Sequence, residues 1–393
     1  MNKLAQRPRR VLPTRRILLC VKSGLVLLVV GGVASAGLAA ASTPSAPVTL
    51  PHTPATKAAP ARPATVKAVA VPVNNSAVTY DTFGVRVDAH DGQIVKDPAS
   101  GLFYLFGTSY GCGFTLSAPA TPWCGVRVYR SADLQTWTPA GAVGGMYAFD
   151  PFTDEFQGEC DSAHFGCFRP HVARRPDGTW VMWVNAIRDP AGYIVLTATA
   201  PGGPYTRTDV PPVLALGPTM DGVGYGDESI TVDPADPTSA WLTYTALGTA
   251  HNHQIAVEQL DPTWTTGTGA VAFLPELHVE APSMFKRGAL WYMMYSDPAC
   301  PYCSNAGSSY DTASSPFGPW TKRGTPWPSS CVGQPAAVNA LNSQFIYQSD
   351  RWAQKPAGGY QPNQYQANNY LAPVTFNTDG TIPAQHCIAS WTL

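Results

Sequence analysis

Residues 280–296 read EAPSMFKRGALWYMMYS, and four other segments of the chain repeat the same design. Each copy opens with a polar residue, continues as a short apolar strand and a turn, and ends in an aromatic-rich strand. Turn sequences such as PASG, RPDG and KRGA lie between the strands, so each copy predicts a β-hairpin. The other copies are DGQIVKDPASGLFYLFGTS at 91–109, RPHVARRPDGTWVMWVNA at 169–186, DESITVDPADPTSAWLTYTA at 227–246 and QPAAVNALNSQFIYQSD at 334–350.

Further strand-like sequence follows every hairpin, for example VRVYRSADLQTWTPAG at 126–141 and YIVLTATAPGGPYTRT at 193–208. Each unit is therefore expected to contain about four strands, and radial repetition of four-stranded sheets forms a β-propeller. The sequence thus predicts an all-β, five-bladed β-propeller. A two-sheet β-sandwich is the alternative, but it does not explain why a polar residue opens every copy.

The residues that open the five copies are Asp91, Arg169, Asp227, Glu280 and Gln334. The innermost strands of a propeller all run the same way along its axis, so these residues are expected to gather at one mouth. Carboxylates held together at a concave site are costly unless a ligand or a reaction uses them. Two carboxylates flanking a ligand suit glycoside hydrolysis, and a third can raise the pKa of the acid by like-charge repulsion. Structural acids that cap turns are the alternative.

Charge and composition narrow the class of ligand. The 393 residues carry a formal net charge of −1, and only 13% of them are charged, which argues against nucleic acid as a partner. A neutral, polar ligand such as a carbohydrate fits better. The 35 Gly and 38 Pro favour many short strands joined by turns.

The N-terminal region is typical of an export signal. Arginines precede an apolar stretch at about 25–41, so residues 1–41 are expected to be a signal peptide or, alternatively, a membrane anchor. Residues 42–77 are rich in Pro, Ala and Thr and predict a disordered linker that could tether the protein to a membrane. Residues 78–393 are then the propeller, secreted or otherwise extracytoplasmic. General secretion is favoured over the twin-arginine route that TRRILL loosely matches.

Cysteine spacing supports an oxidising compartment. Cys20 belongs to the signal, and the other eight cysteines form an even set. A zinc site or a redox motif is the alternative for CPYC, but neither its neighbours nor its context supports one. The expected disulfides are Cys112 with Cys124, Cys160 with Cys167, Cys300 with Cys303, and Cys331 with Cys387.

The ordered set of motifs resembles glycoside hydrolase family 43. EAPSMFKRGALWYMMYS is similar to the fourth-blade signature of that family, DESITVD to its third-blade pattern and DGQI to its first-blade pattern. The resemblance implies a five-bladed propeller with an inverting mechanism, in which Glu280 is the general acid, Asp227 tunes its pKa and Asp91 is the general base.

Within the family, DTFGVRVDAHDG most resembles the exo-β-1,3-galactanase branch. The chain departs from that branch at Asp91, where the branch usually lacks an acid, and at Thr108, where it carries Glu. With an acid at Asp91, the sequence has the three-acid arrangement that is commoner in the family as a whole. A related bacterial subgroup is therefore the other branch that the sequence resembles.

Several further residues are candidate substrate contacts, each with a structural alternative. Arg169 is expected to bind sugar hydroxyls, with a structural ion pair as the alternative, and Gln334 is expected to reach the ligand. His90 is expected to hydrogen-bond the sugar, with a role in holding a strand end as the alternative. Arg351 is expected to rim the pocket together with Asp350 and Trp352, with a salt bridge as the alternative. Tyr110 and Trp123 flank a disulfide-bounded loop and are expected to form a sugar-stacking wall. Five aromatic residues on second strands are assigned to blade packing: Trp180, Trp183, Trp241, Trp291 and Tyr292.

Together these features predict a secreted, metal-independent, inverting exo-glycosidase that acts on polysaccharides of the β-1,3-galactan, arabinan or xylan type. A carbohydrate-binding propeller without catalysis is the alternative. The chain is expected to be a monomer that needs no cofactor. The alternative is a structural calcium or sodium ion in the central channel, with His251 and His253 as its candidate ligands. This alternative is not favoured.

Overall fold

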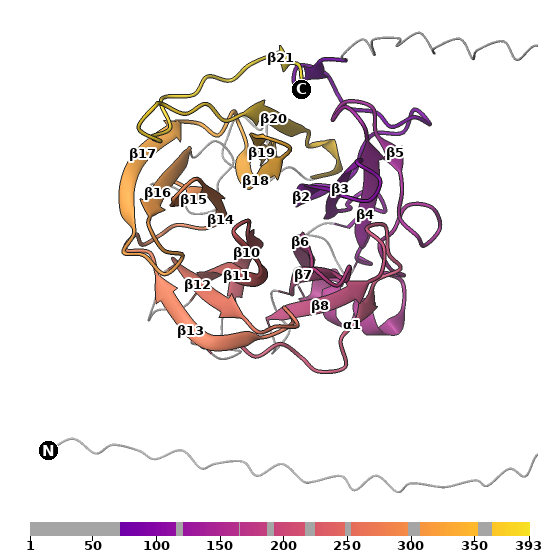
Figure 1. The fold of residues 1–393 in the computed structure, drawn as a ribbon. Helices are drawn as coiled ribbons and strands as arrows, with labels where there is room; N and C mark the ends of the chain where they lie inside the picture. Colours follow the sequence, from indigo (N-terminus) through magenta and orange to yellow (C-terminus); the bar gives the residue numbers. More distant parts are fainter. Residues whose placement is uncertain are drawn as a thin grey trace, which may run out of the picture. The chain divides into compact units, whose positions relative to one another are not determined.

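The computed structural model describes residues 71–114, 121–164, 166–186, 192–216, 225–247, 253–297, 307–352 and 364–393. Their main feature is a ring of five antiparallel β-sheets around a central axis, so the predicted five-bladed propeller is confirmed (Figure 1). The first two blades are β2 (His90–Lys96), β3 (Phe103–Thr108), β4 (Val126–Ser131) and β5 (Thr138–Pro139), then β6 (Cys167–Arg174), β7 (Trp180–Ala186), β8 (Tyr193–Ala198) and β9 (Thr206–Arg207).

The remaining blades follow in chain order. They comprise β10 (Tyr225–Asp233), β11 (Asp236–Ala246), β12 (Gln254–Leu260) and β13 (Gly267–Phe273), then β14 (Ser283–Arg287), β15 (Leu290–Ser296), β16 (Ser308–Ala313) and β17 (Thr321–Trp327), and finally β18 (Gln334–Leu341), β19 (Gln344–Asp350) and β20 (Asn369–Pro373). The first strand of each sheet lies nearest the axis and packs against the first strand of the next sheet, and β18 packs back against β2. The polar residues that open these strands are therefore brought to one end of the channel.

The expectation of four strands per unit is wrong for the fifth blade, which has three strands among the described residues. A separate two-stranded ribbon instead pairs β1 (Val73–Asn74) with β21 (Ser390–Trp391). The Asn75 amide donates to the carbonyls of Leu371 and Ile388, so the start of the domain is bound to the fifth blade and the C-terminal segment. Val73 and Asn75, which fall within the expected linker, therefore contact the C-terminal part of the domain.

Five apolar clusters form the core, and each lies between two adjacent blades. Successive side chains of a strand point to opposite faces, so a second strand buried on both faces is apolar throughout. On β15, Trp291 and Met293 enter the cluster toward the third blade, whereas Tyr292 and Met294 enter the cluster toward the fifth. The five aromatic residues assigned to blade packing are all buried, as predicted.

Three of the four predicted disulfides are confirmed: Cys112–Cys124, Cys160–Cys167 and Cys331–Cys387. Cys300 and Cys303 lie outside the described residues. Three disulfides are typical of an extracytoplasmic protein. The expected signal and most of the expected linker also lie outside the described residues, and within the described part of the chain no helix is long and apolar enough to span a membrane.

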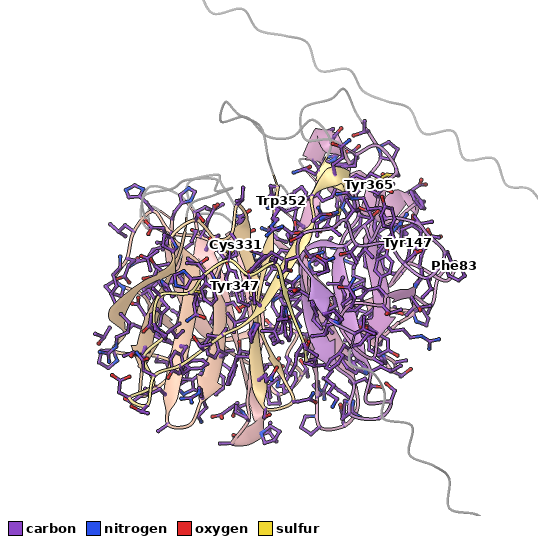
Figure 2. All side chains as sticks on the ribbon, turned by 90° about the horizontal axis from the view of Figure 1, so that it is seen from above. Phe83, Tyr147, Cys331, Tyr347, Trp352 and Tyr365 are labelled. Atoms are coloured by element: carbon purple, nitrogen blue, oxygen red, sulfur yellow. A yellow bond between two sulfur atoms is a disulfide. The ribbon has the colours of Figure 1, made fainter. Side chains whose placement is uncertain are left out.

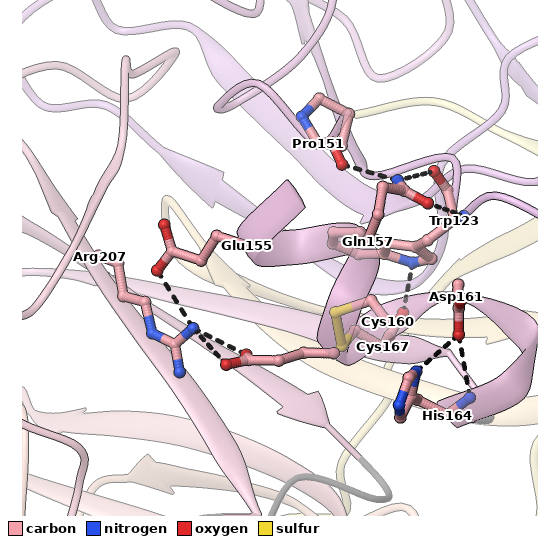
Figure 3. Close-up of a disulfide and its surroundings, with 10 residues drawn as sticks. Trp123, Pro151, Glu155, Gln157, Cys160, Asp161, His164, Cys167 and Arg207 are labelled. Carbon is pink, nitrogen blue, oxygen red and sulfur yellow. Dashed lines mark hydrogen bonds and ion pairs between the residues drawn. A yellow bond between two sulfur atoms is a disulfide. The ribbon is translucent and has the colours of Figure 1, made fainter. Parts of the chain in front are cut away.

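The Cys160–Cys167 disulfide joins the short helix α1 (Asp154–Cys160) to β6 (Figure 3). Two further one-turn helices are η1 (Ser162–His164) and η2 (Gln364–Gln366). In α1, Phe156 is buried with its ring 4.5 Å from that of Phe149, and Arg207 of β9 pairs with acids on the exposed side. The helix therefore covers one outer edge of the second blade.

Candidate active site

Irregular pairing marks the opening of most inner strands. Register shifts occur between His90 and Gln93, Phe168 and His171, Tyr225 and Glu228, and Pro335 and Ala337. Asp91 and Arg169 have φ angles of 49° and 55°, in the left-handed region that costs a non-glycine residue about 1–2 kcal/mol. Bulges re-aim side chains and are common beside active sites. The inner strands run along the propeller axis, and the bulges at their starts allow the side chains of the opening residues to face the mouth of the channel.

Glu280, Asp227 and Gln334 come together across three blades. The Gln334 amide nitrogen donates to Glu280 Oε1 over 3.1 Å and lies 3.4 Å from Asp227 Oδ2. All three side chains are partly exposed, and that of Asp227 is 22% exposed. Two carboxyl groups that share one amide and still reach solvent can act on a polar ligand.

Trp352 follows β19 and orients this amide. Its indole Nε1 donates to Gln334 Oε1 over 2.9 Å, so the NH₂ of Gln334 must face the two carboxyl groups. Figure 2, turned by 90° from Figure 1, places Trp352 toward the same end of the propeller as Tyr365, above Cys331 and Tyr347. Sequence reasoning placed Trp352 only on the rim and did not connect it to Gln334.

We expect Trp352→Phe to lower kcat about threefold to tenfold, because the change keeps an aromatic ring but removes the one donor that orients Gln334. The control is Trp391→Phe, which removes an indole donor to Leu371 O in the β1–β21 ribbon. Steady-state kinetics of both variants checks the expectation. Equal activity of both variants and the wild type would show that Gln334 needs no such partner.

Asp91 lies beside this group. Its carboxyl Oδ1 accepts a hydrogen bond of 3.2 Å from the backbone N–H of Arg169, and its own N–H donates to Asp350. Burial raises the pKa of Asp91 to about 8, and the negative charges of Asp350 and Asp227 act in the same direction. Asp91 and Asp227 are therefore close enough to influence each other electrostatically.

Arg169 is a structural residue, so the expectation that it contacts the ligand is not supported. Its side chain is 1% exposed and donates to the carbonyls of Glu228, Pro282, Pro335 and Ala336. With the bond from its N–H to Asp91, Arg169 connects its own blade to the four others. Its guanidinium also lies 3.7 Å from Asp227, which it can hold in place.

The structure gives no support to His90 as a substrate contact either. The ring is 0% exposed and lies between two buried carboxylates, with Nδ1 3.3 Å from Asp350 and Nε2 3.4 Å from Asp88. Register pairing places Asp350 opposite Gln334, at the end of its hairpin. The other four copies end in Ser or Ala, so an acid at this one position was the available sequence signal for a special role.

The predicted sugar-stacking wall is not found as expected. Trp123 is 0% exposed, donates its indole N–H to Cys167 O, and packs on Phe149 and Phe156, because α1 covers it. Tyr110 is buried as well, in contact with the rings of His90 and Trp352. Neither ring presents a free face to a ligand.

The described partners of Arg351 do not include the site carboxyl groups, so they give no support to its expected place on the pocket rim. Its Nη1 donates to Asn75 O and its Nε to Cys331 O, and its guanidinium lies 4.9 Å from the centre of the Tyr370 ring. The side chain therefore joins the fifth blade to the start of the domain.

His251 and His253 were considered from the sequence as candidate ligands of a structural ion. Within the described ranges, no three His, Cys, Asp or Glu side chains are grouped so that they could hold a metal ion. His251 lies outside those ranges, and burial lowers the pKa of His253.

The comparisons with known proteins agree with this architecture. A family model described as glycosyl hydrolases family 43 matches residues 85–382. A search of curated proteins found no match.

Solved structures of similar fold include three proteins named for action on β-1,3-galactosides. An exo-β-1,3-galactanase from Phanerochaete chrysosporium, solved with galactose, is 24% identical over 82% of this chain and 68% of its own, with a TM-score of 0.64. One from Clostridium thermocellum is 21% identical over 80% and 65%, with a TM-score of 0.63. A family 43 β-1,3-galactosidase solved with galactodeoxynojirimycin is 21% identical over 82% and 100%, with a TM-score of 0.65. The chain spans 64% of another such galactosidase.

Proposed function

Because the chain belongs to glycosyl hydrolase family 43, and is therefore a glycoside hydrolase, we propose that it releases single sugars from polysaccharide chain ends with inversion, β-1,3-galactan being the favoured substrate. The observation that carries the proposal is the meeting of Glu280 and Asp227 at the Gln334 amide, with Asp91 beside them. Such an arrangement supplies the carboxyl groups that glycoside hydrolysis requires.

The proposed roles follow from charge and position. Glu280 donates its proton to the glycosidic oxygen as the C–O bond breaks, while ionised Asp91 takes a proton from the water that attacks the anomeric carbon from the opposite face. Asp227, 3.7 Å from the Arg169 guanidinium, is held as a charged neighbour of Glu280 that helps to keep the acid protonated. Gln334 orients the Glu280 carboxyl through its 3.1 Å bond.

The substrate is proposed from the named relatives. The similar structures are galactanases and galactosidases acting on β-1,3 linkages, one of them solved with β-1,3-galactotriose. Galactosyl, arabinosyl and xylosyl units differ by ring size and a few hydroxyls, so arabinan and xylan belong in the same test. We also propose that residues 1–41 direct export or anchor the protein, and that the Pro-, Ala- and Thr-rich sequence from residue 42 up to the β1 strand is a tether.

The test is hydrolysis of a panel of β-1,3-galactan, arabinan, arabinoxylan, aryl arabinofuranosides, β-xylosides and β-galactosides, with product anomers followed by NMR. Release of galactose alone, first seen as the α anomer, is the expected result. Release of the β anomer would exclude inversion, and release of longer oligosaccharides would exclude exo action. Binding without cleavage would instead support the carbohydrate-binding alternative.

A further inference from the structure

A buried chain of three ionisable side chains lies directly behind Asp91. Asp88, His90 and Asp350 are each at most 1% exposed, and His90 lies between the two carboxylates at 3.4 Å and 3.3 Å. The imidazole packs against the rings of Tyr110 and Trp352, with ring centres 5.5 Å and 5.6 Å away. None of these three ionisable groups has a part in the proposed proton transfers.

The two carboxylates at the ends of this side-chain series, Asp88 and Asp350, both accept hydrogen bonds from backbone N–H groups. Asp88 accepts hydrogen bonds from the N–H groups of Tyr110 and Gly111 and from the Ser109 hydroxyl, at 2.9, 3.0 and 2.6 Å. Asp350 uses one oxygen for His90 and the other to accept the N–H of Asp91. Asp91 is the residue with a φ of 49°, so the carboxylate of Asp350 stabilises a backbone conformation that is otherwise unfavourable.

We propose that Asp88, His90 and Asp350 form a positioning unit that fixes the backbone of Asp91 and sets the pH range in which its carboxyl accepts a proton. The inference rests on the proposed function, since it gives meaning to Asp91 as the base. Asp88 fixes the imidazolium, the imidazolium fixes Asp350, and Asp350 fixes Asp91. These three are positioning residues, because they act on the reaction only through Asp91.

The charges around the unit support this reading. Burial opposes ionisation of His90, but hydrogen bonds and charge interactions with Asp350 and Asp88 outweigh it and raise the pKa of His90 to about 9. The groups that face Asp91 are Asp350 from β19, Asp227 and Glu228 from β10, Arg169 from β6, and Tyr110 after β3. Among the charged neighbours, Asp350 has the strongest effect on Asp91.

The sign of the pH effect follows from these charges. The base must be ionised, and burial together with the Asp350 charge holds the pKa of Asp91 at about 8, so kcat/KM of the wild type should rise with pH up to about 8. In Asp350→Asn a negative charge beside Asp91 is lost. The rising limb should then move to lower pH by about 1–3 units, while kcat falls because Asp91 is less firmly held.

The experiment measures kcat/KM against pH on an aryl glycoside for the wild type, Asp350→Asn and Asp311→Asn. Asp311 is the matched control, a buried carboxyl on β16 that accepts a hydrogen bond from the Tyr295 hydroxyl and also interacts with Glu276. A limb that moves in Asp350→Asn but not in Asp311→Asn is the expected result. A limb that stays in place in an active Asp350→Asn protein would overturn the inference.

NMR of the histidine Cε1–H groups gives a readout on the wild-type protein that does not depend on activity. In the wild type His90 should titrate near pH 9, and its resonance is identified by its loss in His90→Gln. Titration near pH 6.5 would show that the carboxylates do not hold the imidazolium, and the unit would not exist as described. A wild type that cleaves nothing in the substrate panel would instead refute the proposed function, whatever His90 does.

Discussion

Replacing Glu280 by glutamine is expected to lower kcat by about 10²–10⁴-fold on substrates whose leaving group is a sugar, because an amide cannot supply the proton that the departing oxygen needs. The replacement is nearly isosteric, and the oxygen of the new amide can still accept the bond from Gln334 that Glu280 Oε1 accepts in the wild type. The fold should therefore persist. Steady-state kinetics on β-1,3-galactan and circular dichroism measure the two effects.

Leaving-group chemistry separates this role from a general loss of function. Aryl glycosides with an acidic phenol leave without protonation, so the variant should lose far less activity on them than on a sugar leaving group. The control is Glu159→Gln, the same change on α1, where Glu159 pairs with Arg207 outside the mouth. An equal loss on both substrate types would assign Glu280 another role, and full activity on galactan would remove it from catalysis.

Replacing Arg169 by methionine is expected to reduce the free energy of unfolding by about 3–5 kcal/mol, the usual cost of breaking a buried charged network. The side chain is 1% exposed and donates to four carbonyls from three other blades, and methionine leaves all four without that donor. Activity should fall too, because the cation 3.7 Å from Asp227 is lost. Urea unfolding at constant pH measures the stability change.

The matched control is Arg175→Met in the turn after β6. Arg175 pairs with Asp177 at 2.8 Å, and its side chain is 24% exposed, so the change should cost no more than about 1 kcal/mol. A loss of less than about 1 kcal/mol in Arg169→Met would mean that the blades are held by their apolar interfaces alone.

Much of the architecture could be read from local patterns. A hairpin is specified within some twenty residues by period-two alternation and turn chemistry, so five copies predict five blades whatever the distant contacts are. The nearby cysteines could be paired for a similar reason, because a short separation limits their partners. Asp91, Asp227, Glu280 and Gln334 were found because their positions in the repeat are equivalent.

Contacts that depend on strand register or on the packing of distant segments were missed. Trp352 and Gln334 are in contact because β18 and β19 pair in one particular register. An aromatic residue after a strand does not by itself reveal that register in the sequence. Trp123 was expected at the surface but is covered by α1, about thirty residues later. Asp350 and His90 are about 260 residues apart and touch only because the fifth blade closes onto the first.

The amino-acid sequence by itself thus determined the hairpins, the number of blades and the polar residues that open the inner strands, because each depends on side-chain alternation and turns within a short segment. Only the tertiary structure decided which of those residues stay partly exposed and which are buried. Arg169 and Glu280 open equivalent strands, yet one ties the blades together and the other reaches solvent. The physical reason is that burial and partners at the mouth depend on the bulges and on closure of the ring, where each side chain meets residues from other blades.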